Sequence, residues 1–303
     1  MPSWNIHIAH AERLFSRGGA VAQAVVDHNA FLFGGLAPDI PVGYMVPGVE
    51  RPIAYRITHF AEPAFIPKPR EREFWDAYVV PAAKDALRAG GGALRAGSKD
   101  TGTAKSAAES RAGVPIIAAS SLKLEADRVS RVHYPRRYEG AGAPPQEGSE
   151  RDEAVSPADI ARSLFDFELG VWVHLLADCI WNTRVNEFLD REGIAPSEEF
   201  RVKKQGDFDA FGKTLSIDLV PRATPRLIAT AAAFPQYSID ERAVLMTVGV
   251  AHETVRGNTF PSGPVRYRLL TSEFFDSVFE EVAERADALL EGRLQDACLV
   301  ETS

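Results

Sequence analysis

Cysteine is nearly absent from this chain, which has two, Cys179 and Cys298, among 303 residues. Two cysteines cannot provide a disulfide framework, so nothing in the sequence demands an oxidising compartment. Cys179 lies in an apolar run with helical spacing, where a buried free thiol is expected. The fold must therefore depend on a hydrophobic core, and a chain of this length with 45% hydrophobic residues can form one.

Long hydrophobic runs are also missing. The two most apolar windows, residues 244–251 and 169–181, are short or are interrupted by His174 and Asp178. A membrane-spanning helix needs about 20 apolar residues. The first five residues lack the basic and apolar regions of a secretory signal. We therefore expect no membrane span and a cytoplasmic protein.

Positive charge is the third shortage. The chain has 34 lysines and arginines against 42 aspartates and glutamates, which gives a formal net charge of −8. A protein that neutralises nucleic-acid phosphates needs a basic surface. Nucleic acid is therefore not the expected partner.

Helical signals dominate what is present. Ser156-Pro157 followed by Asp159 combines an N-cap hydroxyl, a proline in the first turn and a carboxylate at the positive end of the helix dipole. The stretch Ser238 to Glu241 has the form of a capping box. The expected helices cover residues 6–15, 20–33, 157–190, 243–256 and 272–290, and alternation predicts brief strands at 215–220 and 265–270. The predicted class is mainly α.

Two segments contain little that could pack into a core. Residues 89–113 and 139–157 are rich in glycine, alanine, proline and charge, so burial cannot offset their ordering entropy. They are interpreted as flexible insertions, separated by residues 115–133, which are apolar enough for a packed helix. The whole chain, 1–303, is predicted to be a single helical domain. The alternative is a helical core with a C-terminal extension at 200–303.

The strongest chemical motif is GVWVHLLADCIWN at residues 170–182. His174 and Asp178 are four residues apart, so on a helix both side chains leave the same face. Their neighbours are apolar, and a buried carboxylate needs a partner. A shared cation such as Zn²⁺ would satisfy both groups, because nitrogen and carboxylate oxygen are its ligands. The alternative is a hydrogen-bonded pair inside a helical core.

Two further motifs place single polar groups after apolar segments. Asp39 lies in FLFGGLAPDIP, on a turn framed by glycine and proline, and His59 lies in Thr-His-Phe before a proline-rich loop. Each has an ordinary interpretation, because an aspartate can bond its own turn and a histidine can lie at a helix edge.

The remaining histidines divide by their surroundings. His7 and His10 are three residues apart near the start of the chain, a spacing that can hold a metal ion on one helix face. His28 and His133 lie among polar residues and are expected at the surface. His252, on a late helix, is not assigned.

Taken in order, these fragments resemble the zinc-dependent phospholipase C family, which is similar to the single-strand-specific zinc nucleases. The matching parts are a histidine at position 7, the Gly-x-x-x-Pro-Asp loop, Thr-His-Phe, and His-x3-Asp followed by Trp-Asn. The resemblance covers residues 1–190 and implies an all-helical fold. It implies one zinc ion shared by Asp39, His59, His174 and Asp178, and a neighbouring ion on His7 and Asp178.

The chain also departs from that family pattern. Arg184 stands six residues after Asp178, where the phospholipases have a histidine, and no His-x3-Glu follows His174. We therefore expect one zinc ion, or two if His7 or His10 joins Asp178 around the second.

The expected function is zinc-dependent hydrolysis of a phosphodiester or a phosphomonoester, with a soluble phosphoester or a phospholipid head group as substrate. Asp178 is then a metal ligand, and Asp39 either completes the metal site or acts as the general base. Arg184 is a weaker candidate for contacting the substrate phosphate. The first alternative is a protein that keeps one ion for stability without catalysis. The second is a helical interaction protein without metal.

Overall fold

The computed structural model describes residues 2–90, 155–259 and 265–296. Within these ranges the protein is mainly helical, and the only β pairing is an isolated bridge between Ala61 and Pro69. The predicted fold class is confirmed. The elements are α1 (Trp4–Arg17), α2 (Ala20–Ala24), α3 (His28–Gly34), the 3₁₀ turn η1 (Ala37–Asp39), α4 (Tyr55–Thr58), α5 (Glu71–Phe74), the π-helical turn η2 (Trp75–Val79), α6 (Val80–Gly90), α8 (Pro157–Glu192), α9 (Glu198–Gly212), α10 (Pro225–Ala232), α11 (Glu241–Arg256) and α12 (Ser272–Asp296).

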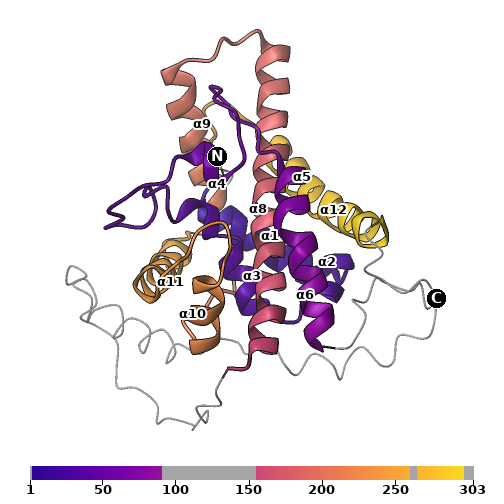
Figure 1. The fold of residues 1–303 in the computed structure, drawn as a ribbon. Helices are drawn as coiled ribbons and strands as arrows, with labels where there is room; N and C mark the ends of the chain where they lie inside the picture. Colours follow the sequence, from indigo (N-terminus) through magenta and orange to yellow (C-terminus); the bar gives the residue numbers. More distant parts are fainter. Residues whose placement is uncertain (1, 91–154, 260–264, 297–303) are drawn as a thin grey trace.

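The longest of these helices, α8, runs through the middle of the molecule (Figure 1). It begins at the predicted N-cap Ser156, where a capping box forms: the Ser156 hydroxyl accepts from the Asp159 amide and the Asp159 carboxylate accepts from the Ser156 amide. It ends at Gly193, whose φ of 62° is the left-handed conformation that glycine adopts without strain. Helices α3, α6, α10 and α12 pack against α8, which therefore forms the core's axis.

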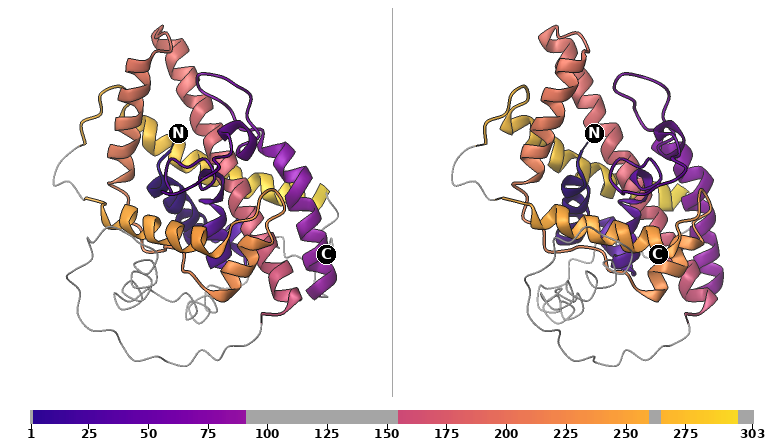
Figure 2. Two further views of the ribbon diagram at one scale, coloured as in Figure 1. Left: turned by 60° about the vertical axis from the view of Figure 1, so that its left-hand side comes forward. Right: turned by 90° about the vertical axis from the view of Figure 1, so that its left-hand side faces the viewer.

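The buried apolar residues form two clusters along α8. The larger one surrounds its first half and includes Trp172, Phe33 and Phe167. The second surrounds Trp181 and includes Phe208 of α9 and Phe275 of α12. Both views in Figure 2 show α9 beside the C-terminal part of α8. His174 and Asp178 lie between these clusters along the helix.

The helix expected at 20–33 is in fact two helices, and this prediction was wrong. Val25 is extended, and Asp27 caps α3 by accepting from the Ala30 amide. The buried Asp166 carboxylate of α8 accepts hydrogen bonds from the backbone amides of Val26 and Asp27. The break is therefore stabilised by a carboxylate that comes from far along the chain.

Both expected strands are also absent, because side-chain carboxylates take the place of a strand partner. Glu12 accepts from the backbone amides of Asp218 and Leu219 in the first segment. Asp207 accepts from those of three successive residues, 268–270, in the second. Extended segments satisfied in this way need no sheet.

Smaller corrections concern helix starts, helices that were not predicted and one thiol. Asp240 caps α11 instead of Ser238. Helices α5, α6, α9 and α10 had not been predicted.

Cys179 is partly exposed rather than buried. The first expected insertion, 89–113, starts inside α6, and the second, 139–157, reaches the start of α8; the rest of both, and residues 115–133, lie outside the described residues.

Candidate metal centre

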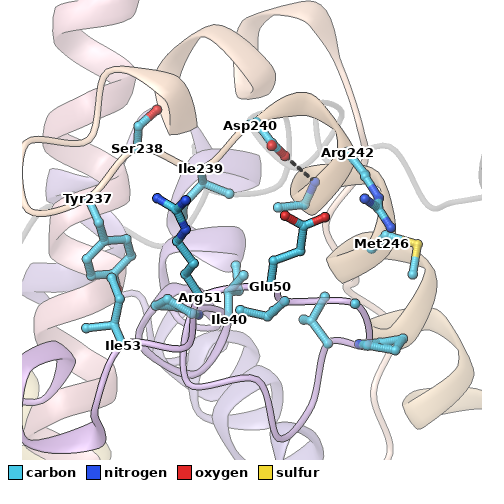
Figure 3. A pocket seen from close by; sticks show the side chains of 16 residues that line it. Ile40, Glu50, Arg51, Ile53, Tyr237, Ser238, Ile239, Asp240, Arg242 and Met246 are labelled. Carbon is cyan, nitrogen blue, oxygen red and sulfur yellow. Dashed lines mark hydrogen bonds between the residues drawn. The ribbon is translucent and has the colours of Figure 1, made fainter.

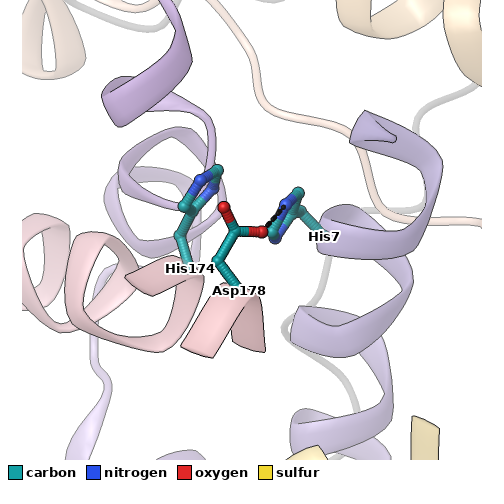
Figure 4. Close-up of side chains that lie close together, drawn as sticks. All are labelled: His7, His174 and Asp178. Carbon is teal, nitrogen blue, oxygen red and sulfur yellow. Dashed lines mark ion pairs between the residues drawn. The ribbon is translucent and has the colours of Figure 1, made fainter. Parts of the chain in front are cut away.

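α8 contributes His174 and Asp178, whose side chains leave one face of the helix toward α1, as predicted from their spacing (Figure 4). Both residues are only 1% exposed. His7, on α1, reaches the same point from the opposite side. The three residues therefore form a buried polar group between the two helices.

The ring of His174 is held in one orientation by its Nδ1 atom, which lies 2.8 Å from the carbonyl oxygen of Gly35. A carbonyl only accepts, so Nδ1 carries the proton and Nε2 has a free lone pair. Two glycines allow α3 and α8 to approach this closely. A Cβ on Gly34 would lie 2.0 Å from the Phe167 carbonyl oxygen, and a Cβ on Gly170 would lie 2.1 Å from the Phe31 carbonyl oxygen. Burial, followed by repulsion from His7, lowers the pKa of His174 to about 3, so the ring is neutral at pH 7.

His59 follows the last residue of α4 and is fully buried. Its Nδ1 lies 2.7 Å from the Thr58 hydroxyl, which in turn donates to the Tyr55 carbonyl over 3.2 Å. In this chain of hydrogen bonds Nδ1 is the donor, so His59 also presents an unprotonated Nε2. That atom lies 3.1 Å from Nε2 of His174. Two lone pairs therefore face each other in a buried site.

Asp39 is the last residue of η1, four residues after Gly35, which caps the end of α3. Trp4 Nε1 donates to its Oδ2 over 3.0 Å, and its Oδ1 lies 3.5 Å from His59 Nε2. Burial alone would raise the pKa of Asp39, but the neighbouring imidazoles, His59 first, favour the ionised carboxylate more strongly and lower it. The carboxylate is therefore ionised at neutral pH.

His7 and Asp178 complete the cluster. His7 Nε2 lies 3.5 Å from Asp178 Oδ1, and neither atom has a hydrogen-bond partner although both are buried. The His7 ring stacks on that of His174 with 3.8 Å between centroids. Burial opposes ionisation of Asp178, but the surrounding imidazoles, His7 first, hold its pKa well below the usual range.

These five side chains form two overlapping sets of ligand atoms, each lying within 4.8 Å of one another. One set is His7, His174 and Asp178, and the other is Asp39, His59 and His174. Tetrahedral Zn²⁺ with bonds of about 2.0–2.1 Å keeps its ligand atoms about 3.3 Å apart. The observed separations of 3.1 and 3.5 Å fit that requirement. The residues present therefore suit a divalent ion with nitrogen and oxygen ligands.

His10 is next to this cluster without offering it a ligand atom. Trp181 Nε1 donates to His10 Nε2 over 3.0 Å, so the neutral ring carries its proton on Nδ1. Burial and the proximity of His7 lower the pKa of His10 well below its usual value. Nε2 is thus occupied as an acceptor, whereas Nδ1 is buried without a partner, and His10 is not among the ligand sets.

The other predicted residues lie elsewhere. The guanidinium of Arg184 pairs with Glu281, at 2.7 and 2.5 Å, and with Glu187, so it is engaged by carboxylates on α12 and α8. His28 is half-buried against Phe15 rather than fully at the surface. His252 is buried, with Nε2 3.2 Å from the Pro221 carbonyl. His133 lies outside the described residues.

Sequence reasoning missed the residues that hold the ligands in place. Trp4, Tyr55 and Thr58 each bond directly to a ligand of the cluster. No local pattern marks them, although Thr58 belongs to the Thr-His-Phe motif. Their roles depend on contacts between segments that are distant in sequence.

A cavity of about 450 Å³ begins at Ile40, the residue after Asp39 (Figure 3). The loop that ends at Ile53 forms one wall, and the start of α11 forms the other. Tyr237, just before α11, also lines the cavity, and its hydroxyl donates to the Ala37 carbonyl of η1 over 3.0 Å. The turn that carries Asp39 is therefore bonded to a residue that lines the cavity.

Comparison of the chain with protein-family models, with curated proteins and with solved structures finds no match. Among the described residues, no helix is both long enough and apolar enough to cross a membrane.

Proposed function

We propose that this protein is a zinc-dependent phosphoester hydrolase, in which Asp39, His59, His174, Asp178 and His7 hold one or two ions. The observation that carries the proposal is the pair of Nε2 atoms of His59 and His174, 3.1 Å apart, while each Nδ1 is bonded to an oxygen. Histidine ligands of metals commonly donate their other ring N–H in this manner.

A metal-free explanation requires a different proton arrangement. The Thr58 hydroxyl would have to donate to His59 Nδ1, so that His59 Nε2–H could donate to His174. That arrangement gives up the Thr58 bond to the Tyr55 carbonyl. It also leaves His7 Nε2 and Asp178 Oδ1 buried without partners, which is costly in a dry site. Cations bound by the two ligand sets would give all four atoms a partner.

The phosphoester class of substrate comes from the resemblance of four short segments to the zinc-dependent phospholipases C. When bound, a divalent ion supplies a Lewis acid that polarises a phosphoryl oxygen and lowers the pKa of water. The lowered pKa values of Asp39 and Asp178 favour ligand roles for both carboxylates over a general-base role. The Asp39 side chain is 11% exposed and that of Asp178 only 1%, so substrate is expected to approach from the Asp39 side.

The experiment is elemental analysis and a turnover assay on protein purified without a histidine tag or chelator. We expect about one to two equivalents of zinc and chelator-sensitive hydrolysis of bis(p-nitrophenyl) phosphate. Well under half an equivalent, even after growth with added zinc, would exclude the metal role.

A second candidate is a protein that binds the ion for stability alone. The observation that favours it is the burial of the ligands: His59 is 0% exposed, and His174 and Asp178 are each 1% exposed. Structural zinc sites are closed, whereas catalytic sites keep an open position. Zinc that raises the unfolding temperature without any phosphoester hydrolysis would support this candidate against the first.

A further inference from the structure

Tyr55 contacts two of the candidate ligands without being one itself. It is the first residue of α4 and is half-buried. Its hydroxyl donates to Asp178 Oδ2 over 2.8 Å, and its ring stacks on that of His59 with 3.7 Å between centroids. One side chain thus links a ligand on α8 to the ligand that follows α4.

The hydrogen bond makes the two oxygens of Asp178 different. Oδ2 accepts from Tyr55 and lies 3.8 Å from His59 Nε2, whereas Oδ1 has no partner and lies 3.5 Å from His7 Nε2. Burial and the Asp178 charge raise the pKa of Tyr55 far above its usual value, so the hydroxyl keeps its proton. Tyr55 is the donor in this bond, because an ionised carboxylate only accepts.

We propose that Tyr55 is a positioning residue that restricts Asp178 to binding metal through Oδ1, on the His7 side of the cluster. Asp178 then belongs to the set with His7 and His174 and does not bridge to the set of Asp39 and His59. This differs from the family resemblance, which places Asp178 on both ions. The inference rests on one part of the proposed function, that the cluster binds a metal ion. It does not require that the protein hydrolyses a phosphoester.

The test is a Co²⁺ titration of the metal-free full-length protein, followed by visible absorption, with wild type, Tyr55→Phe and the control Tyr78→Phe. Phenylalanine keeps the ring on His59 and removes only the hydroxyl. Loss of an outer hydrogen bond to a ligand typically weakens metal binding about 10- to 100-fold, and we expect this for Tyr55→Phe. We also expect a weaker visible band, because a freed Oδ2 lets both carboxylate oxygens coordinate and raises the coordination number. Tyr78, which packs in η2 against Phe74 and Phe234, should leave affinity and spectrum unchanged.

A double-mutant cycle separates positioning from a general loss of structure. If Tyr55 acts through Asp178, adding Tyr55→Phe to Asp178→Ala should not weaken Co²⁺ binding further. Thermal unfolding of the metal-free variants checks that each is folded.

Unchanged affinity and spectrum in Tyr55→Phe would overturn the inference and leave the hydrolase proposal standing. Metal binding with the expected Tyr55 effect but without turnover would overturn the hydrolase proposal alone. A wild-type protein that binds no Co²⁺ or Zn²⁺ would overturn both.

Discussion

Two buried polar groups lie along α8, and they differ in how their hydrogen bonds are completed. In the first, Arg293 of α12 donates from both Nη atoms to the carboxylate of Glu71, at 2.6 and 2.9 Å. Trp172 Nε1 donates to the same carboxylate, and the guanidinium lies over the rings of Trp75 and Trp172. Opposite charges meet, so this group is complete as it stands.

In the second group, acceptors face acceptors. The Nε2 atoms of His59 and His174 meet at 3.1 Å, and the His7 and Asp178 atoms that face each other lack partners. Both groups are largely shielded from solvent, with side chains 8% and 14% exposed for Arg293 and Glu71 and 0% and 1% for His59 and Asp178, so burial of polar residues does not distinguish structure from function. The distinguishing feature is whether the protein itself supplies the missing positive charge.

Replacing a ligand should give the largest effect. We expect His174→Ala to lower zinc affinity by more than about 100-fold, since even outer hydrogen-bond partners of ligands cost 10- to 100-fold. His59→Ala should do the same, and the double variant should be hardly worse. Elemental analysis and the phosphodiester assay measure both effects. His28→Ala is the control, and the assignment fails if it abolishes activity while His174→Ala retains metal and rate.

Breaking the complete group should instead affect stability alone. Arg293→Met leaves the Glu71 carboxylate buried without its cation, which costs about 3–5 kcal/mol. Urea unfolding at fixed zinc concentration gives the change in the free energy of unfolding. Zinc content of the folded fraction should stay at the wild-type level. A loss of zinc equal to that of His174→Ala would show that the two groups are not independent.

Removing the metal should destabilise the wild type to an intermediate extent. An ion present at 100 times its dissociation constant stabilises the native state by about 2.7 kcal/mol. The unfolding temperature should therefore rise with zinc concentration in the wild type and in Arg293→Met. In His174→Ala it should not respond to zinc, and an equal response there would place the bound ion elsewhere.

Replacing Glu168, also on α8, should change stability least, and the change should depend on pH. Its Oε2 has no partner, and burial, followed by the charge of Asp85, raises its pKa to about 8. The folded state therefore holds a proton that the unfolded chain releases near pH 4.5, and stability falls as pH rises from about 5 to 8. We expect Glu168→Gln, which cannot ionise, to be more stable than wild type at pH 9 by about 1–3 kcal/mol.

At pH 5 that difference should shrink, because Glu168 is then neutral in the folded state. Histidine acts with the opposite sign. The lowered pKa of His174 means that the unfolded state takes up its proton first, so this residue destabilises the metal-free protein as pH falls from 6.5 toward 3. Thermal unfolding of Glu168→Gln and wild type between pH 5 and 9 separates the two trends.

Local sequence patterns predicted the parts of the fold whose cause is local. The start of α8 follows from Ser156, Pro157 and Asp159. Predictions failed where distant carboxylates intervened, as when Asp166 stabilises the break after α2 and Asp207 satisfies an expected strand. Such contacts join residues more than 60 positions apart, beyond the range of any periodicity.

The sequence by itself determined which residue types were available at the site: His174 and Asp178 on one helix face, Asp39 on a rigid turn and His59 before a proline-rich loop. Helical and turn geometry depend on near neighbours, so these placements could be predicted. Only the tertiary structure decided which ring nitrogens are free and which carboxylate oxygen faces His7. Those choices depend on the Gly35 carbonyl, the Thr58 hydroxyl and the Tyr55 hydroxyl. Hydrogen-bond partners of a buried ligand come from whichever segments pack against it, and packing is a property of the whole fold.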